Sequence, residues 1–483
     1  MTAADRRPMP PIPPLEAIRN IHVIGICGTA MGSLAALLQE RGYRVSGSDA
    51  MAYPPMSTWL EARGLTILSG YDASHIPDDA DLVVVGNVAR RDNPESVAAQ
   101  ERGLPALSMP EVLRALCFPG RDVLAVTGTH GKTTTASMVA YLLYAAERDP
   151  SFFIGGVTGN FASNYRLGEG PEFVIEGDEY DTAWFDKVPK FWHYPAQFAT
   201  INNIEFDHAD IYPDLDSILH VFRRFAQQLP SNGELWVNGD DANAVSVTKG
   251  IAARVRKFGL LPGNELRAVD IGVSESGMRA RILERGVDQG LVDVPCQGVY
   301  NLRNFLAAAG ILRSCGVPLT DSMRLIAGFQ TPRRRQELVG EAGGVHVFDD
   351  FAHHPSAVNE TLTALRQRFP DARIHAAFEA KSNTSRRAVF QNAYVEAFVN
   401  ADSVTLAPPW KQDALPEDQK LSIPRLLNDI EALGKDVVAL DDTDAQEERL
   451  LSLAQPGDVI VTLSGSNFGN LAKKVFERLQ RER

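Results

Sequence analysis

Short apolar runs alternate with longer stretches of helical apolar spacing along most of the chain. At three places an apolar run ends in a glycine turn and leads directly into a helical pattern, at residues 21–49, 122–147 and 457–479. Strands that alternate with helices in this way are typical of parallel sheets covered by helices. The pattern therefore predicts an α/β protein with three separate sheet domains rather than tandem repeats.

Chain length and composition place the domain junctions. The chain has 483 residues, well beyond the ~250–300 at which a single core stops growing. Segments 107–122 and 328–337 contain the prolines, glycines and arginines that interrupt the pattern between units. We expect three domains: residues 1–118, which open like a Rossmann fold; 119–332, with a parallel sheet of the P-loop type; and 333–483, again Rossmann-like.

The net charge of −13 argues against a general nucleic-acid binder, because phosphate backbones select basic surfaces. No apolar stretch is long enough to span a membrane. The N-terminal segment 1–16 lacks the apolar core of a secretory signal and is predicted to be a flexible proline-rich arm. The four cysteines form no C-x-x-C pair, which suits a reducing compartment. These features predict a cytoplasmic soluble protein.

The first glycine turn, with Gly25, Gly28 and Gly32, follows an apolar run and precedes an alanine- and leucine-rich helix. This is the outline of a dinucleotide-fold opening. The glycines do not fit G-x-G-x-x-G, so the turn alone is a weak signal. A plain βαβ unit without a ligand stays an open alternative.

The second turn, "VTGTHGKTTT", resembles a phosphate-binding loop that is shorter than G-x-x-x-x-G-K-[ST]. Glycines allow backbone N–H groups to surround phosphate oxygens, and the helix N-terminus adds positive potential. Lys132 is placed to reach the β/γ-phosphates, and Thr133 or Thr134 to ligate Mg²⁺. An ordinary glycine turn is the alternative, but it leaves the lysine and the threonines unexplained.

Acidic residues follow two further strand patterns. Segment 173–186 leads to Glu176, and segment 198–212 contains "NNIEFDH", which ends at His208. Ligands gather at the carboxyl edge of parallel sheets, and Mg²⁺ takes a few hard ligands. Glu176 and His208 are therefore our candidate magnesium ligands. Solvated acidic loops are the alternative interpretation.

The motifs "GTHGKTTT", "NNIEFDH" and "DDFAHHP", together with the Glu176 segment, resemble in this order the Mur ligases of bacterial cell-wall synthesis. The resemblance runs from Gly25 to about Gly469. It implies an N-terminal domain for a UDP-sugar, a central ATPase domain and a C-terminal domain that receives an amino acid or peptide. The shortened loop is the form which that family uses.

Within this family, the chain is more similar to members that attach a recovered tripeptide to UDP-N-acetylmuramate than to members that add L-alanine. Tyr180 stands where the alanine-adding members have serine, and the segments 378–387 and 464–470 resemble those of the tripeptide-adding members. Two departures concern peptide recognition. Lys381 stands where we expect arginine, and Ser466-Asn467 changes the order of the last turn.

The resemblance also implies roles for individual residues. The ATP site would comprise Gly128, Thr129, His130, Gly131, Lys132, Thr133, Thr134, Asn301, Asn304, Arg334 and Asp350. Magnesium would be held by Thr133, Glu176 and His208. Catalysis would use Lys132, Glu176, His208, Arg335 and His353 or His354. In the family's H-N-x-x-N motif, Tyr300 here replaces the histidine.

Two further groups of residues are expected to bind substrates. The UDP-sugar would contact Gly28, Met31, Gly32, Asp49 and Asn87. The peptide would contact Lys381, Ser382, Asn383 and Thr384. A helix cap is an alternative role for Asn304 and for the histidine pair, because both stand close to predicted helix starts.

The expected reaction is ATP-dependent ligation through an acyl phosphate, with ATP and Mg²⁺ as cofactors, UDP-N-acetylmuramate and the murein tripeptide as partners, and a monomer or weak dimer as the assembly. An L-alanine-adding ligase is the nearest alternative. A nucleotide-gated binding protein without ligation is a rival from another class. An NAD-dependent oxidoreductase would rest on the first glycine turn alone and would leave Lys132, Glu176 and His208 unexplained.

Overall fold

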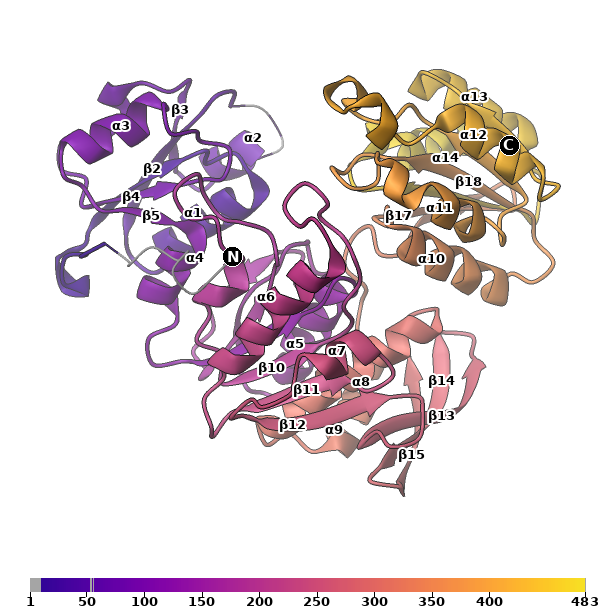
Figure 1. Cartoon of the computed structure of the whole chain (residues 1–483), viewed down its shortest axis with the longest axis horizontal. Helices are drawn as coiled ribbons and strands as arrows, with labels where there is room; N and C mark the ends of the chain where they lie inside the picture. The colour runs from indigo at the N-terminus through magenta and orange to yellow at the C-terminus, as the bar shows by residue number, and fades with distance from the viewer. Residues whose placement is uncertain (1–9, 53, 55, 483) are drawn as a thin grey trace.

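The computed structural model describes residues 10–52, 54 and 56–482 (Figure 1). Its first sheet is parallel throughout, in the order β3-β2-β1-β4-β5. The strands are β1 (Asn20–Ile24), β2 (Arg44–Asp49), β3 (Thr66–Ser69), β4 (Leu82–Val85) and β5 (Ala106–Ser108). The helices are α1 (Thr29–Glu40), α2 (Met56–Glu61), α3 (Pro94–Glu101) and α4 (Met109–Val112). The strand order reverses at β1, where dinucleotide folds bind their ligands.

The central sheet has the order β15-β14-β13-β12-β11-β10-β6-β9-β7-β8. Its strands are β6 (Asp122–Thr127), β7 (Ser151–Phe153), β8 (Tyr165–Arg166), β9 (Glu172–Glu176), β10 (Phe198–Ile201), β11 (Glu234–Asn238), β12 (Arg254–Gly259), β13 (Leu266–Val273), β14 (Met278–Glu284) and β15 (Val287–Val294). Its helices are α5 (Lys132–Ala145), α6 (Leu215–Gln228), α7 (Ala242–Ser246), α8 (Val299–Ser314) and α9 (Leu319–Leu325). The strands β13, β14 and β15 form an antiparallel extension, which the sequence pattern did not indicate.

The third sheet has the order β16-β17-β21-β18-β19-β20 and is parallel except at β16. Its strands are β16 (Glu337–Ala342), β17 (Val345–Asp350), β18 (Ile374–Glu379), β19 (Ser403–Leu406), β20 (Asp436–Ala439) and β21 (Val459–Ser464). Its helices are α10 (Pro355–Arg368), α11 (Gln391–Ala397), α12 (Ile423–Glu431), α13 (Thr443–Leu453) and α14 (Leu471–Glu482).

The three sheets confirm the predicted α/β architecture, and each of the three predicted strand–turn–helix units is present. The junctions near 118 and 332 stay predictions. Of the proline-rich arm predicted for residues 1–16, residues 1–9 lie outside the described part of the chain. Among the helices that the structure describes, none has the length and apolar character needed to cross a bilayer.

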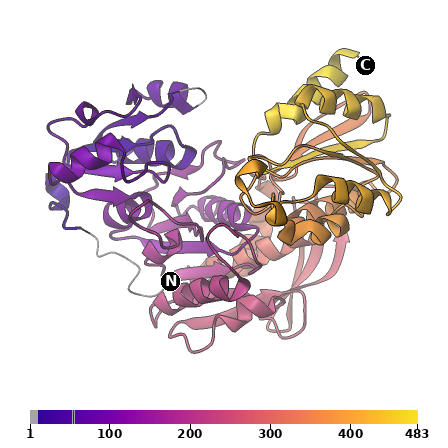
Figure 2. The same ribbon diagram turned by 45° about the horizontal axis from the view of Figure 1, so that its top comes forward.

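Packing joins the domains unequally. The first and central domains share a hydrophobic core, in which the Phe118 and Phe173 rings lie 5.0 Å apart. The C-terminal domain has its own core, into which the partly buried Phe206 of the central domain packs. In both views the first domain lies at the upper left and the C-terminal domain at the upper right, with the central domain below and between them (Figures 1 and 2). The central domain is therefore packed against both of its neighbours.

Candidate active site

The phosphate loop occupies the four positions between β6 and α5. Gly128 and Gly131 have φ values of 134° and 77°, in the region that favours glycine. A Cβ atom at Gly131 would lie 2.4 Å from Asn304 Oδ1. The backbone N–H of Thr129 donates to the carbonyl of Asn203 at 3.0 Å, and that of His130 donates to the Asn203 side chain at 2.7 Å. The neighbouring strand end thus fixes the shape of the short loop.

Lys132 is held inside this loop. Its Nζ donates to the Gly128 carbonyl at 2.7 Å and to both carboxylate oxygens of Glu179, at 2.9 and 3.1 Å. Burial alone lowers the pKa of Lys132, but Glu179 and Asp178 outweigh burial and raise the pKa above the ordinary lysine value. Lys132 is therefore a charged group at the helix start. Glu179 was not among the predicted site residues, and nothing in the run of acids at 176–181 singled it out.

Glu176 ends the strand β9, which pairs with β6 so that Glu176 lies opposite Val126. Its carboxylate accepts hydrogen bonds from Thr133 Oγ1 at 3.0 Å and from the Gly155 backbone at 2.7 Å. Burial raises its pKa, and Lys132 opposes that rise. A carboxylate beside the first hydroxyl of the helix is a donor pair that suits a hard cation such as Mg²⁺.

His208 lies in a second group, with Glu179 and Asp178. Its Nε2 is 3.2 Å from Glu179 Oε1. One ligand atom from each of these three side chains lies within 4.8 Å of the others. Burial lowers the pKa of His208, but Glu179 and Asp207 outweigh burial and raise it to about 9. Of the predicted magnesium ligands, Thr133 and Glu176 are in direct contact, whereas His208 contacts Glu179 instead.

The C-terminal domain contributes Arg335. Its guanidinium donates to Thr133 Oγ1 at 3.2 Å, and it lies 4.8 Å from the centre of the Phe351 ring. The neighbouring Arg334 points elsewhere, because its guanidinium contacts Asp349 at 3.1 Å and the Ser464 carbonyl at 2.6 Å. Of the two predicted arginines, the structure brings Arg335 to the phosphate loop and leaves Arg334 within its own domain.

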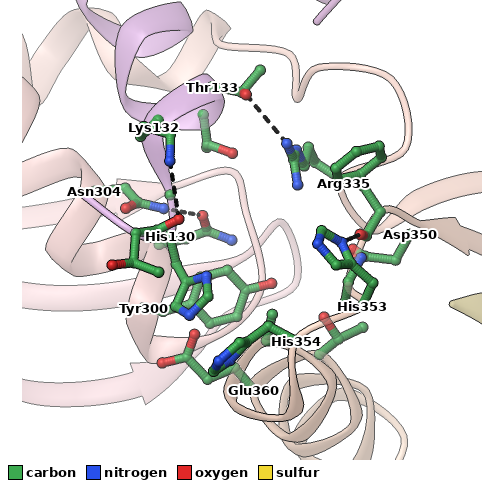
Figure 3. Close-up of a pocket in the computed structure, with 18 of the residues that line it drawn as sticks. His130, Lys132, Thr133, Tyr300, Asn304, Arg335, Asp350, His353, His354 and Glu360 are labelled. Atoms are coloured by element: carbon green, nitrogen blue, oxygen red, sulfur yellow. Dashed lines mark hydrogen bonds between the residues drawn. The ribbon is translucent and has the colours of Figure 1, made fainter. Parts of the chain in front are cut away.

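A cavity of about 220 Å³ separates the phosphate loop from the C-terminal domain (Figure 3). His353, His354 and Asp350 line its far wall. Burial lowers the pKa of His353, and burial together with the neighbouring His130 lowers that of His354 to about 4. Both imidazoles are therefore neutral at pH 7 and able to accept a proton. His354 also accepts from the Ser356 backbone at 3.3 Å and caps α10.

The two asparagines predicted for the ATP site lie in the first turns of α8. Asn301 Nδ2 donates to the Gln297 carbonyl at 2.7 Å, and Asn304 Nδ2 donates to Asn301 Oδ1 at 2.9 Å. Both line the cavity, as does Tyr300. Because Asn304 Oδ1 also approaches the Gly131 position, the amide pair borders the phosphate loop directly.

The residues predicted to bind the UDP-sugar gather around the switch point of the first sheet. Gly28 precedes α1, and Met31 and Gly32 lie in its first turns. Asp49 ends β2 and accepts a hydrogen bond from the Cys27 backbone at 2.9 Å. Asn87 follows β4, and its amide lies 3.4 Å from Asp181 of the central domain. This last contact links the group to the acidic segment beside Lys132.

The segment 381–384, predicted to bind a peptide, faces the central domain. Asn383 Nδ2 donates to Asp210 at 2.8 Å and to the Tyr180 hydroxyl at 3.2 Å. The Thr384 hydroxyl accepts from the Ala209 backbone at 3.1 Å. Lys381 instead pairs with Glu379 of its own domain at 3.2 Å, and Ser382 forms a turn with Ser385. Tyr180 and Asp210 are thus partners that the sequence did not assign to this segment.

Three family models match the chain in order: the Mur ligase family catalytic domain at 20–118, the Mur ligase middle domain at 126–312 and the Mur ligase glutamate ligase domain at 334–466. The chain is 38% identical to the UDP-N-acetylmuramate–L-alanyl-γ-D-glutamyl-meso-2,6-diaminoheptandioate ligase of Escherichia coli strain K12. That alignment covers 96% of this chain and 99% of the relative.

Two further comparisons extend this result. The chain is 34% identical to the UDP-N-acetylmuramate–L-alanine ligase of Oleidesulfovibrio alaskensis, over 93% of this chain and 96% of the relative. Its fold matches the crystal structure of a murein peptide ligase from Psychrobacter arcticus with a TM-score of 0.72 at 32% identity, over 96% and 99% of the two chains. The chain belongs to the Mur ligase family.

Proposed function

We propose that the protein joins the tripeptide L-alanyl-γ-D-glutamyl-meso-diaminopimelate to UDP-N-acetylmuramate at the expense of ATP. Two tripeptide ligases, 38% and 35% identical to the chain over 96% of its length, support this substrate pair. The observation that carries the chemistry is the contact from Arg335 to Thr133. It adds a C-terminal cation to a phosphate loop that already holds Lys132.

The first step is the transfer of the γ-phosphoryl group from ATP to the lactyl carboxylate of the sugar. Phosphoryl transfer depends on positioning and on neutralisation of charge. Lys132 and Arg335 would supply fixed positive charge from two sides of the cavity. Thr133 with Glu176 would hold Mg²⁺, and so would Asp178 and Glu179, with His208 as a ligand once it gives up the proton that its raised pKa retains. Mg²⁺ neutralises phosphate charge when bound.

The second step is attack of the tripeptide amine on the acyl phosphate, with release of inorganic phosphate. The attacking nitrogen must lose a proton. His353 and His354 are neutral and face the cavity, so each has an imidazole that could accept that proton. The pKa of about 4 makes His354 a weak base at pH 7. The cavity lies between domains, and closure of the C-terminal domain would exclude water from the reactive intermediate.

The substrates would arrive from separate domains. We assign the UDP-sugar to the switch point of the first sheet, with Asp49 and Asn87, and the peptide to the segment around Asn383. ATP would occupy the phosphate loop and the cavity next to Asn304. Because the UDP-sugar and ATP are both cytoplasmic metabolites, we place the reaction in the cytoplasm, with the chain acting as a monomer or weak dimer.

The L-alanine ligase activity is the second candidate, because relatives with that name are 31–34% identical over nearly the full chain. One experiment separates the two. Purified protein is mixed with UDP-N-acetylmuramate, ATP and Mg²⁺, and ADP release is followed with either the tripeptide or L-alanine. We expect turnover with the tripeptide and little with L-alanine. Turnover that requires L-alanine would overturn the proposal. ADP release at the same rate with and without the UDP-sugar would indicate a nucleotide-gated binding protein.

A further inference from the structure

Three side chains from two domains converge at one edge of the cavity. His130 comes from the phosphate loop, Glu205 follows β10, and His354 precedes α10 of the C-terminal domain. His130 Nε2 lies 3.2 Å from Glu205 Oε2, and His354 Nδ1 lies 3.6 Å from the same oxygen. The two imidazole rings are 4.6 Å apart. His130 is a predicted member of the ATP site and His354 a candidate proton acceptor, but Glu205 has no part in the proposed reaction and no role is assigned to the three as a group.

We propose that His130, Glu205 and His354 form a site for a transition-metal ion of the Zn²⁺ type, distinct from the carboxylate-rich magnesium positions. The site would exist only while the central and C-terminal domains are in contact, because each domain supplies part of it.

Donor spacing supports the proposal. With Zn–N and Zn–O distances of about 2.0–2.2 Å, the ligand atoms of a tetrahedral site lie roughly 3.3–3.6 Å from one another. The two measured spacings, 3.2 and 3.6 Å, match that edge length, and all three ligand atoms lie within 4.8 Å. An ion could therefore enter with only small side-chain adjustments.

The surroundings orient the ligands as metal sites require. A ligating histidine usually donates its other ring N–H to a carbonyl, and ligating carboxylates are hydrogen-bonded in turn. His354 Nε2 lies 3.2 Å from the Phe206 carbonyl, which leaves Nδ1 as the nitrogen with a lone pair. The Ser356 hydroxyl donates to Glu205 Oε2 at 2.7 Å. A metal would replace two long hydrogen bonds. One runs from the Ser356 backbone to His354 Nδ1 at 3.3 Å, and the other runs from His130 Nε2 to Glu205 Oε2 at 3.2 Å.

Charge and ligand type point to the kind of ion. Glu205 is a carboxylate, because interactions with His130 and Ser356 outweigh burial and lower its pKa to about 2. His354 is neutral, so the Nδ1 lone pair of His354 and the negative charge of Glu205 are both available to a cation. Two imidazoles and one carboxylate suit Zn²⁺, Co²⁺, Ni²⁺ or Cu²⁺, whereas Mg²⁺ prefers oxygen ligands. His130 and His354 line the cavity, and His130 and Glu205 line an adjoining one, so an ion has access.

Occupancy would have a functional consequence. A bound ion would tie the phosphate loop to the C-terminal domain and would engage the lone pair of His354. We expect Zn²⁺ to slow turnover by holding the domains together. A chelator should reverse this inhibition.

Cobalt spectroscopy on the full chain, without nucleotide and in excess Mg²⁺, tests the site. We expect Co²⁺ to give the intense visible bands of four-coordinate Co²⁺ at one equivalent per chain, and Zn²⁺ to abolish them. Glu205→Gln, His130→Gln and His354→Gln should each weaken Co²⁺ binding at least about tenfold. His346→Gln, which alters a histidine–glutamate pair elsewhere in the C-terminal domain, and His208→Gln, in the other group, should leave the bands unchanged.

Melting curves and circular dichroism identify variants that fold as the parent does, and only these are compared. Weak six-coordinate bands in the parent protein would overturn the proposal. So would bands that survive in all the folded variants of the three ligands, or bands that disappear in His208→Gln. None of these measurements depends on ligase activity. The proposed function can therefore be refuted while the metal site is confirmed, and the metal site can be refuted while the proposed function is confirmed.

Discussion

Arg335 crosses from the C-terminal domain to the phosphate loop and donates a hydrogen bond to Thr133 Oγ1 at 3.2 Å. Thr133 in turn donates to Glu176 at 3.0 Å. One hydroxyl thus connects an arginine of one domain with a carboxylate of another. Because the phosphate loop and Arg335 belong to different domains, the proposed ATP site would require both domains to be in place.

Arg335→Ala should lower kcat by about 10²–10³ with little change in the KM for UDP-N-acetylmuramate. The guanidinium is expected to stabilise charge that develops on the transferred phosphoryl group, and loss of one such donor has an effect of that size. Steady-state ADP release measures it. Arg333→Ala is the matched control, since Arg333 is exposed in the same run of arginines. Equal losses of kcat in Arg335→Ala and Arg333→Ala would show that Arg335 has no specific role in phosphoryl transfer.

Lys132→Met should lower the rate of ADP release at least about a hundredfold and leave the fold intact. The methionine side chain has similar length but carries no charge to place against the phosphates. Removal of the lysine also takes away the 2.9 Å ion pair with Glu179 and leaves His208 as its cationic partner, so a melting curve accompanies the assay. Near-normal turnover in a folded variant would refute the phosphate-loop assignment.

Glu176→Gln should raise the Mg²⁺ concentration needed for half-maximal activity by about tenfold or abolish activity. The amide keeps the shape of the side chain but removes the charge that would attract the cation beside Thr133. A Mg²⁺ titration of turnover measures the shift. Glu169→Gln, an exposed glutamate on the loop before the same strand, is the control. An unchanged titration would exclude Glu176 from the metal site.

Tyr180→Ser should raise the KM for the tripeptide by about tenfold while the KM for ATP stays within error. The Tyr180 hydroxyl hydrogen-bonds to Asp210 and accepts from Asn383 at 3.2 Å, so it connects the peptide segment with the central domain. Loss of one such hydrogen bond near a charged group is worth about 1.4 kcal/mol, which corresponds to that factor. An unchanged KM for the tripeptide in this variant would mean that Tyr180 and segment 381–384 do not bind the peptide.

Local pattern was sufficient to predict the frame of the site. The apolar run at 122–127, the glycines and the threonines after Lys132 predicted a strand, a turn and a helix, and β6 and α5 are there. Glu176 and His208 were expected at sheet edges. Glu176 ends β9 and His208 follows β10, the two strands that flank β6. These predictions succeed because strand direction and helix start depend mainly on neighbouring residues.

Partners across long sequence distances were not predictable. Glu179 contacts Lys132 rather than solvent because the chain folds back after β9, and no local feature separates Glu179 from its acidic neighbours. Arg334 has a φ of 58° and faces its own domain, whereas Arg335 faces the phosphate loop, although the two are adjacent in the sequence. The antiparallel strands β13–β15 also depend on sheet pairing, which the alternation of strands and helices does not encode.

Glu95 is a buried carboxylate of the first domain, far from the phosphate loop in sequence, and offers a test of how charge stabilises the fold. It is 0% exposed, its Oε2 lies 3.2 Å from His22 Nε2, and its Oε1 lies 3.1 Å from His75 Nδ1. Burial raises its pKa, but hydrogen bonds with His22 and Ser48 outweigh burial, so the net pKa is lowered. A carboxyl with a lowered pKa stabilises the folded state above its unfolded pKa and loses that contribution as pH falls.

Glu95→Gln should therefore lower the free energy of unfolding at pH 7 by about 2–3 kcal/mol, the cost of losing hydrogen bonds to a charged group. Urea unfolding of parent and variant, followed by circular dichroism, measures the difference. The difference in the free energy of unfolding between parent and variant should become smaller as pH falls below the ordinary pKa of glutamate, because the Glu95 carboxyl of the parent then takes up a proton. Glu101→Gln, on the exposed end of α3, should show neither effect. A gap that is constant between pH 7 and pH 3 would mean that packing, rather than the charge of Glu95, accounts for the loss.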